Sequence, residues 1–202
     1  MTAREEFGQE LSAIEYVAGL EAAWDREFPG VVPLLDNREP HRRWVRFHSL
    51  PESKRYPETD DEMRHVLRLH ERILTSLRDS TPGEPLLVVG STWYGAGDPV
   101  GPPPQGLDGA ILWRIERSWN EDDEVDAALW VSTRYQRAEQ LTDLLTAVAE
   151  GPGGPILITT PSLSWRYHPY DGGGDVVAVD RRQRRRIAWE FRERLSPRRD
   201  GM

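Results

Sequence analysis

The sequence predicts an α+β fold, with a mostly antiparallel sheet of about five to seven strands flanked by about four helices. Two observations lead to this expectation. Amphipathic helical segments bracket runs of short strand-like segments, whereas a parallel sheet requires strand and helix to alternate regularly. Turns rich in glycine and proline separate the strand-like segments. The chain of 202 residues is expected to form a single globular domain over residues 1–202.

The first two predicted elements are a helix over residues 5–28 and a strand over residues 44–49. Apolar side chains recur in the helix with a helical period, and Pro29 and Gly30 end it. In the strand, alternation separates a polar face from a more apolar one: Trp44, Arg46 and His48 on the first, Val45, Phe47 and Ser49 on the second.

The second helix has the clearest start signal in the chain. Thr59 and Glu62 have the spacing of a capping box, and the two aspartates between them complement the helix dipole. The apolar stripe that follows predicts a helix over residues 60–77, with His70 as a packed core histidine. The stripe consists of Met63, Val66, Leu67, His70, Ile73, Leu74 and Leu77.

Four apolar runs in the middle of the chain predict further strands, at residues 86–93, 110–116, 126–133 and 156–160. A loop over residues 94–109 follows the first of them. Its Gly95-x-Gly97 pattern leads into prolines and not into the helix that phosphate binding needs, so it is interpreted as a plain loop. An acidic connection, Glu121 to Glu124, precedes the third run, and residues 137–149 are predicted to be a helix.

The C-terminal part predicts a hairpin and a last helix. Residues 165–170 and 175–179 are the two strands of the hairpin, which turns around Gly172-Gly173-Gly174. The helix is predicted over residues 181–195, with its apolar side on Ile187, Ala188, Phe191 and Leu195.

The composition excludes several classes of function. The chain has no cysteine, which excludes thiol nucleophiles, disulfides, iron–sulfur clusters and cysteine zinc sites. The first ten residues lack the apolar run of a signal peptide, and no apolar stretch is long enough to cross a bilayer. We therefore expect a soluble, cytoplasmic protein with no cofactor, no metal and no membrane contact.

The charge is unevenly distributed. The net charge is −8, yet residues 181–202 contain nine arginines against three acidic residues. An acidic body disfavours nucleic acid as a partner. Arginines at the start of a helix also oppose its dipole. The run from Arg181 to Arg186 is therefore interpreted as a solvated helix face, with contact to RNA as the alternative.

The most interesting pattern is a repeated triplet. Arg46-Phe47-His48 and Arg166-Tyr167-His168 each place an arginine and a histidine on one face of a predicted strand. We expect all four side chains to share one surface, whether the strands are neighbours or have one strand between them. The arginines suit phosphate or carboxylate, and a histidine beside an aspartate suits acid–base chemistry. The alternative is a solvated sheet face with cross-strand pairs.

The candidate surface for an anion or a partner includes the polar residues that follow each triplet. Clustered cations repel one another, so either nearby aspartates or a bound anion must offset them. The candidate residues are Arg46, His48, Lys54, Arg55, Arg166, His168, Tyr170, Asp171 and Asp175.

Three segments resemble a bacterial family of uncharacterised proteins defined by a domain of unknown function. They are WVRFHSLPESKRYP at 44–57, YHPYDGGGDVV at 167–177 and LSPRRDGM at 195–202. The resemblance implies a shared fold and a shared surface formed by the candidate residues above except Arg166. It implies no activity. The family has a tryptophan just before the last segment, where this chain has Arg194, so the end of the last helix is expected to pack differently.

Three functions remain open at this point. The preferred interpretation is a small binding or interaction module, such as a regulatory or toxin-neutralising protein, because the acidic chain lacks common catalytic signatures. The second is an enzyme for a phosphorylated or carboxylated small molecule, with His48 or His168 as acid–base group and Arg46 and Arg166 as anion clamps. The third is an RNA-binding accessory protein that uses the arginine run. The expected partners are thus another protein or a small anionic ligand.

Overall fold

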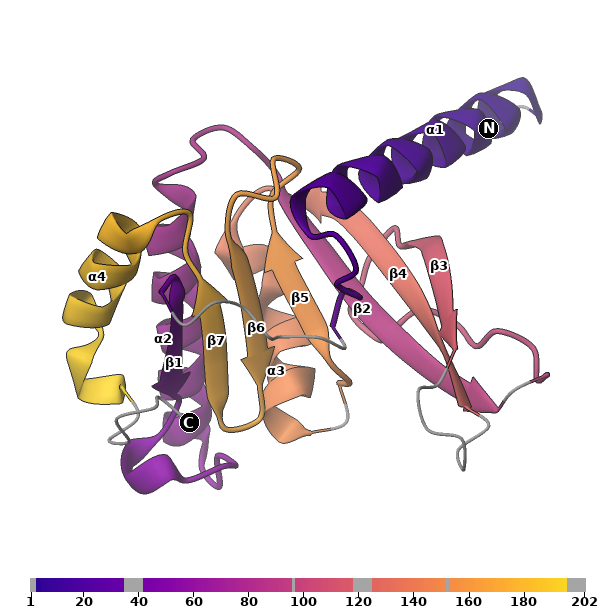
Figure 1. Cartoon of the computed structure of the whole chain (residues 1–202). Coiled ribbons are helices and arrows are strands. Elements are labelled where there is room, and N and C mark those ends of the chain that lie inside the picture. Colours follow the sequence, from indigo (N-terminus) through magenta and orange to yellow (C-terminus); the bar gives the residue numbers. More distant parts are fainter. Residues whose placement is uncertain (1–2, 35–41, 96, 118–124, 152, 196–202) are drawn as a thin grey trace.

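A computed structural model describes the backbone of residues 3–34, 42–95, 97–117, 125–151 and 153–195, with side chains from residue 15 onward. Within these ranges the chain forms four α-helices and a seven-stranded sheet in which all neighbouring strands are antiparallel (Figure 1). The predicted α+β fold is confirmed. The acidic connection at 121–124 and the end of the C-terminal segment, 196–202, lie outside the described residues.

The strand order places the C-terminal hairpin between the first predicted strand and the rest of the sheet. In spatial order the strands are β1 (Trp44–His48), β7 (Gly173–Val177), β6 (Arg166–Tyr170), β5 (Ile156–Thr159), β2 (Leu86–Gly95), β4 (Val125–Tyr135) and β3 (Ile111–Arg117). The first predicted strand, β1, is therefore an edge strand beside β7.

The helices cover the two faces of the sheet unequally. The helices are α1 (Ala3–Glu27), α2 (Asp60–Arg78), α3 (Thr142–Glu150) and α4 (Arg181–Glu190). Three of them, α2, α3 and α4, lie on one side of the sheet, and the C-terminal part of α1 packs on the other side, against β2, β3 and β4 (Figure 1). Short 3-10 turns occur at Pro51–Ser53, Ala138–Leu141 and Arg192–Arg194. Among the described residues, no helix is long and apolar enough to span a membrane.

The larger core lies between the sheet and α2, α3 and α4. Strand alternation directs Phe47, Tyr167 and Val176 toward α2, where Ile73 and Leu74 are fully buried. Burial of each such large side chain stabilises the fold by about 1.5–3 kcal/mol. The predicted separation of Trp44, Arg46 and His48 from Val45 and Phe47 on two faces of β1 is confirmed, since burial alternates along the strand.

His70 contributes a polar contact to this core. Its Nδ1 atom and the Tyr167 hydroxyl share a hydrogen bond between α2 and β6. Burial lowers the pKa of His70 to about 4, so the imidazole is neutral at physiological pH. The sequence-based expectation of a packed core histidine is confirmed, because His70 is only 1% exposed.

The smaller core lies between the sheet and α1. Trp24 is fully buried there, and its ring packs on Phe28 and edge-on against Trp113 of β3, with centroids 4.7 and 5.6 Å apart. The indole nitrogen donates a hydrogen bond to the carbonyl of Val31 over 2.7 Å. Beneath α1, alternate residues of three strands complete the core: Leu87, Val89, Leu129, Val131 and Leu157.

The start of α2 agrees with its sequence signal. Thr59 is the N-cap, and its hydroxyl accepts a hydrogen bond of 3.2 Å from the backbone N–H of Glu62. The Glu62 carboxylate accepts in turn from the backbone N–H of Glu58, at 2.7 Å. The backbone N–H groups of Glu58, before the cap, and of Glu62, in the first turn, are thus both hydrogen-bonded.

Two C-terminal boundaries differ from the prediction. Strand β7 begins at Gly173 and not at 175, because two glycines enter the ladder where side chains have no room. The last helix ends at Glu190 instead of continuing to 195, since Phe191 leaves helical geometry and a 3-10 turn follows.

Candidate functional site

The structure brings the two Arg-x-His triplets onto one face of the sheet, with β7 between them. In the register, Arg46 of β1 lies opposite Asp175 of β7, which lies opposite His168 of β6. The neighbouring rows are Trp44, Val177 and Arg166 on one side, and His48, Gly173 and Tyr170 on the other. We call this the β1–β7–β6 face. It lies on the opposite side of the sheet from α2.

Arg46 and Asp175 form the centre of this face. The Arg46 Nε and Nη2 atoms donate to the two carboxylate oxygens over 2.7 and 2.8 Å. The guanidinium carbon also lies 5.2 Å from the Trp44 ring and 5.7 Å from the Tyr170 ring. Hydrogen bonding to Asp175 raises the pKa of Arg46, so the guanidinium stays charged. The carboxylate, and not an external anion, offsets this cation.

The two histidines of the face each have a buried ring nitrogen. Nε2 of His48 and Nε2 of His168 have no hydrogen-bond partner within the described part of the chain. Burial lowers the pKa of both imidazoles; Arg46 lowers it further, and Asp175 partly offsets this for His168. Burial also raises the pKa of Tyr170 to about 12. Neutral polar groups therefore surround the central ion pair.

Arg166 is on the same face but is covered. It is 5% exposed, and its guanidinium carbon lies 4.1 Å from the ring of Phe28 and 5.8 Å from that of Trp24. The chain at the end of α1 provides this cover, which strand alternation alone does not reveal. Arg166 thus helps to hold α1 on the sheet.

The remaining candidate residues divide between two places. Arg55 donates to Asp171 over 2.6 Å at the edge of the face, and hydrogen bonding to Asp171 raises the pKa of Tyr56. Lys54 instead donates to Glu62 over 2.8 and 2.9 Å. Lys54 therefore stabilises the start of α2, and the carboxylates of Asp171 and Asp175 pair with Arg55 and Arg46.

A second polar cluster, which the sequence analysis did not single out, lies at the other side of the sheet. A cavity of about 400 Å³ opens between α2 and the turn that follows α4. We call it the α2–C-terminal pocket. Its lining consists of His65, Arg68, Leu69, Arg72, Glu190, Phe191, Arg192, Glu193 and Arg194. The triplet residues do not line it.

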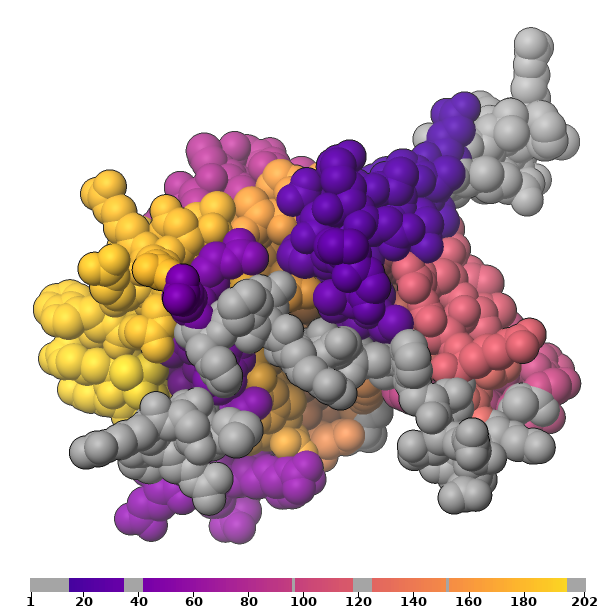
Figure 2. Space-filling model, viewed as in Figure 1, coloured from indigo at the N-terminus to yellow at the C-terminus, as the bar shows by residue number. Residues whose placement is uncertain are grey.

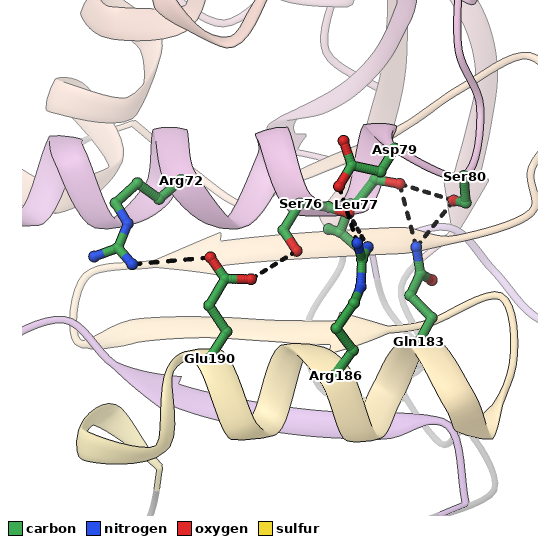
Figure 3. Close-up of polar contacts among 8 residues, drawn as sticks. All are labelled: Arg72, Ser76, Leu77, Asp79, Ser80, Gln183, Arg186 and Glu190. Atoms are coloured by element: carbon green, nitrogen blue, oxygen red, sulfur yellow. Dashed lines mark hydrogen bonds and ion pairs between the residues drawn. The ribbon is translucent and has the colours of Figure 1, made fainter.

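Polar contacts fix α4 against α2 beside this pocket (Figure 3). Arg186 donates to the Ser76 carbonyl over 2.6 Å and to Asp79 over 2.9 Å. Gln183 donates to the Leu77 carbonyl over 3.2 Å. These bonds reach carbonyls in the last turn of α2, where the Leu77 carbonyl also accepts from Ser80. These contacts between α2 and α4 therefore hold the residues on both sides of the pocket in place.

The same contacts revise the interpretation of the arginine run as a solvated face. Besides Arg186, Arg184 is engaged, because its Nε donates to the Trp44 carbonyl over 3.2 Å. Arg181, Arg182 and Arg185 are exposed. Figure 2 shows α4 along the outer edge of the molecule. The run therefore combines anchoring residues with exposed ones.

No three metal-ligating side chains gather within the described ranges. Searches of curated proteins and of solved structures returned no match. A family model described as a domain of unknown function, DUF3885, matches residues 33–199. This range includes both the β1–β7–β6 face and the α2–C-terminal pocket. The chain therefore belongs to the DUF3885 family.

Proposed function

We propose that this protein is a binding or interaction module, and that its β1–β7–β6 face contacts a partner protein. One observation carries the proposal: Nε2 of His48 and Nε2 of His168 are buried without hydrogen-bond partners among the described residues. An unpaired buried polar group costs about 1–3 kcal/mol. Each unpaired buried polar group in a folded protein calls for an explanation, and a partner molecule that supplies the missing hydrogen bonds would provide one for both histidines. Regulation or toxin neutralisation in the cytoplasm would be forms of such a role.

The surroundings of the histidines also support a protein partner. Arg46 is already neutralised by Asp175, so the face does not require an anion. Trp44 and Tyr170 flank the ion pair. Tryptophan, tyrosine and arginine are the residue types most enriched at the energetic centres of protein interfaces.

The proposal is tested with a variant that removes both imidazoles, His48→Ala combined with His168→Ala. Proteins captured by the immobilised wild type are identified and purified, and their Kd is measured by calorimetry. We expect binding to the double variant to be weaker by about tenfold or more. Trp93→Ala is the matched control, since it removes an exposed aromatic ring at the far end of the sheet. Equal Kd values for the wild type and a folded double variant would refute the proposal.

One observation favours a catalytic alternative. His168 lies directly opposite Asp175, the arrangement in which a carboxylate can orient an imidazole for acid–base chemistry. This role would act on a phosphorylated or carboxylated small molecule. Because burial lowers the pKa of His168, a rate that depends on it as a base would rise with pH through that pKa and then level off. Turnover of such compounds that is lost in His168→Ala would favour the enzyme over the binding module.

A further inference from the structure

We propose that the α2–C-terminal pocket binds the phosphate group of a small phosphorylated molecule. This site is separate from the β1–β7–β6 face, because α2 and α4 pack on the opposite side of the sheet. The two proposals therefore stand or fall independently.

The first argument is the charge of the lining. Four arginines face two glutamates in the pocket, although the whole chain has a net charge of −8. Neither Arg68 nor Arg194 has an ion pair within the described part of the chain. A phosphate monoester has a charge of about −1.5 to −2 at neutral pH, which matches the excess of arginines. A single carboxylate would offset only half of it.

The second argument is the state of the two glutamates. Glu190 is engaged, because its carboxylate accepts a hydrogen bond from Ser76 over 3.1 Å and lies 3.8 Å from Arg72 (Figure 3). Glu193 also lines the pocket, and its charge opposes an anion. Removal of that charge should therefore strengthen binding, which gives the proposal a test of opposite sign.

The third argument is the mixed chemistry of the cavity. Leu69 and Phe191 give it an apolar part, and the Arg72 guanidinium carbon lies 5.1 Å from the Phe191 ring. His65 contributes a buried Nε2 atom that has no hydrogen-bond partner among the described residues. A volume of about 400 Å³ suits a small organic molecule, with the phosphate at the arginines and the remainder against the apolar side chains.

The experiment measures the binding of inorganic phosphate, phenyl phosphate and benzoate to the full chain by calorimetry. Ionic strength is kept constant, because salt screens exposed charges. We expect saturable binding of phenyl phosphate that is tighter than that of phosphate, and weak or no binding of benzoate. Weaker binding of phenyl phosphate than of phosphate, or tighter binding of benzoate than of both, would overturn the proposal.

Matched variants locate the site. Arg68→Gln combined with Arg194→Gln should weaken phenyl phosphate binding by about tenfold or more. Glu193→Gln should tighten it by a few-fold, roughly the effect of one like charge near a surface. Arg64→Gln is the control, because Arg64 is exposed on α2 one turn before Arg68 and does not line the pocket. If the double variant unfolds, the single exposed substitution Arg68→Gln provides the same comparison. Equal affinities across all variants would refute the site.

Discussion

Arg46 and Asp175 form a two-point ion pair across neighbouring strands, with the arginine between two aromatic rings. The carboxylate is buried, whereas the Arg46 side chain is 29% exposed. This difference in exposure determines how the pair should respond to mutation. If Asp175 is replaced, the partly exposed Arg46 can regain some hydration, whereas a buried Asp175 left without Arg46 could not.

Asp175→Asn should destabilise the protein by about 2 kcal/mol. The neutral amide leaves the guanidinium without its counter-charge, and partial exposure keeps the loss below that of a fully buried pair. Urea denaturation gives the free energy of unfolding. Asp171→Asn is the comparison, since its partner Arg55 is 67% exposed and the loss should stay below about 1 kcal/mol. Equal losses of unfolding free energy would show that the buried Arg46–Asp175 pair stabilises the protein no more than the exposed Arg55–Asp171 pair.

Acid should destabilise the protein through His70. Its pKa is about 4 in the folded state against an ordinary value of 6.5, so protonation favours the unfolded chain. The contribution of neutral His70 is present above pH 6.5 and is lost as the pH falls toward 4. The difference corresponds to about 3 kcal/mol. His70→Gln should show a shallower loss of stability over this range in urea titrations at several pH values. A pH dependence identical to that of the wild type would contradict the assignment.

Thr59→Ala should cost about 1 kcal/mol, because the N-cap hydroxyl accepts from the backbone N–H of Glu62. Thr75→Ala serves as control within the same helix. The Thr75 hydroxyl only donates to the Glu71 carbonyl, which already has a helical partner, so its loss should change stability little. Thermal unfolding of both variants distinguishes a cap effect from a general effect of removing threonine.

Gly174→Ala should be strongly destabilising, by about 3 kcal/mol or more. An added Cβ atom would lie 2.6 Å from Cε2 and 2.7 Å from the hydroxyl of the buried Tyr167. At Gly172 the nearest atom would be Arg55 Cγ at 3.6 Å, an ordinary contact, so Gly172→Ala should be tolerated. Expression and melting temperatures of both variants measure the contrast. Similar losses at the two positions would mean that turn flexibility, and not space, explains these glycines.

Local sequence patterns predicted the helices and strands, and which residues share a face of each strand. The cap at Thr59 and the alternation of Arg46 with Phe47 depend on nearest neighbours in the chain, and the structure confirms both. The same alternation placed both triplets on one face, but it could not identify β7 as the strand between them. Nor could it show that Phe28 covers Arg166, because that contact joins residues far apart in sequence.

The α2–C-terminal pocket was missed for a related reason. Its walls come from two segments that only tertiary packing brings together, so no continuous motif marks it. The one local signal is Arg68 and Arg72, which are four residues apart and share a helix face. Such a spacing is also typical of a solvated helix and does not by itself indicate a cavity.

Helix α1 has a consequence for how the protein can be dissected. The family match begins at residue 33, after α1 has ended, yet Trp24 and Phe28 complete the core on one side of the sheet. The matched range thus leaves out part of the smaller core. A fragment trimmed to the matched range would expose Leu87, Val89 and Leu129 to water and would lose the cover over Arg166. Aggregation of such a fragment would be explained by the loss of the apolar cover that α1 and Phe28 provide, and not by the fold of the matched range.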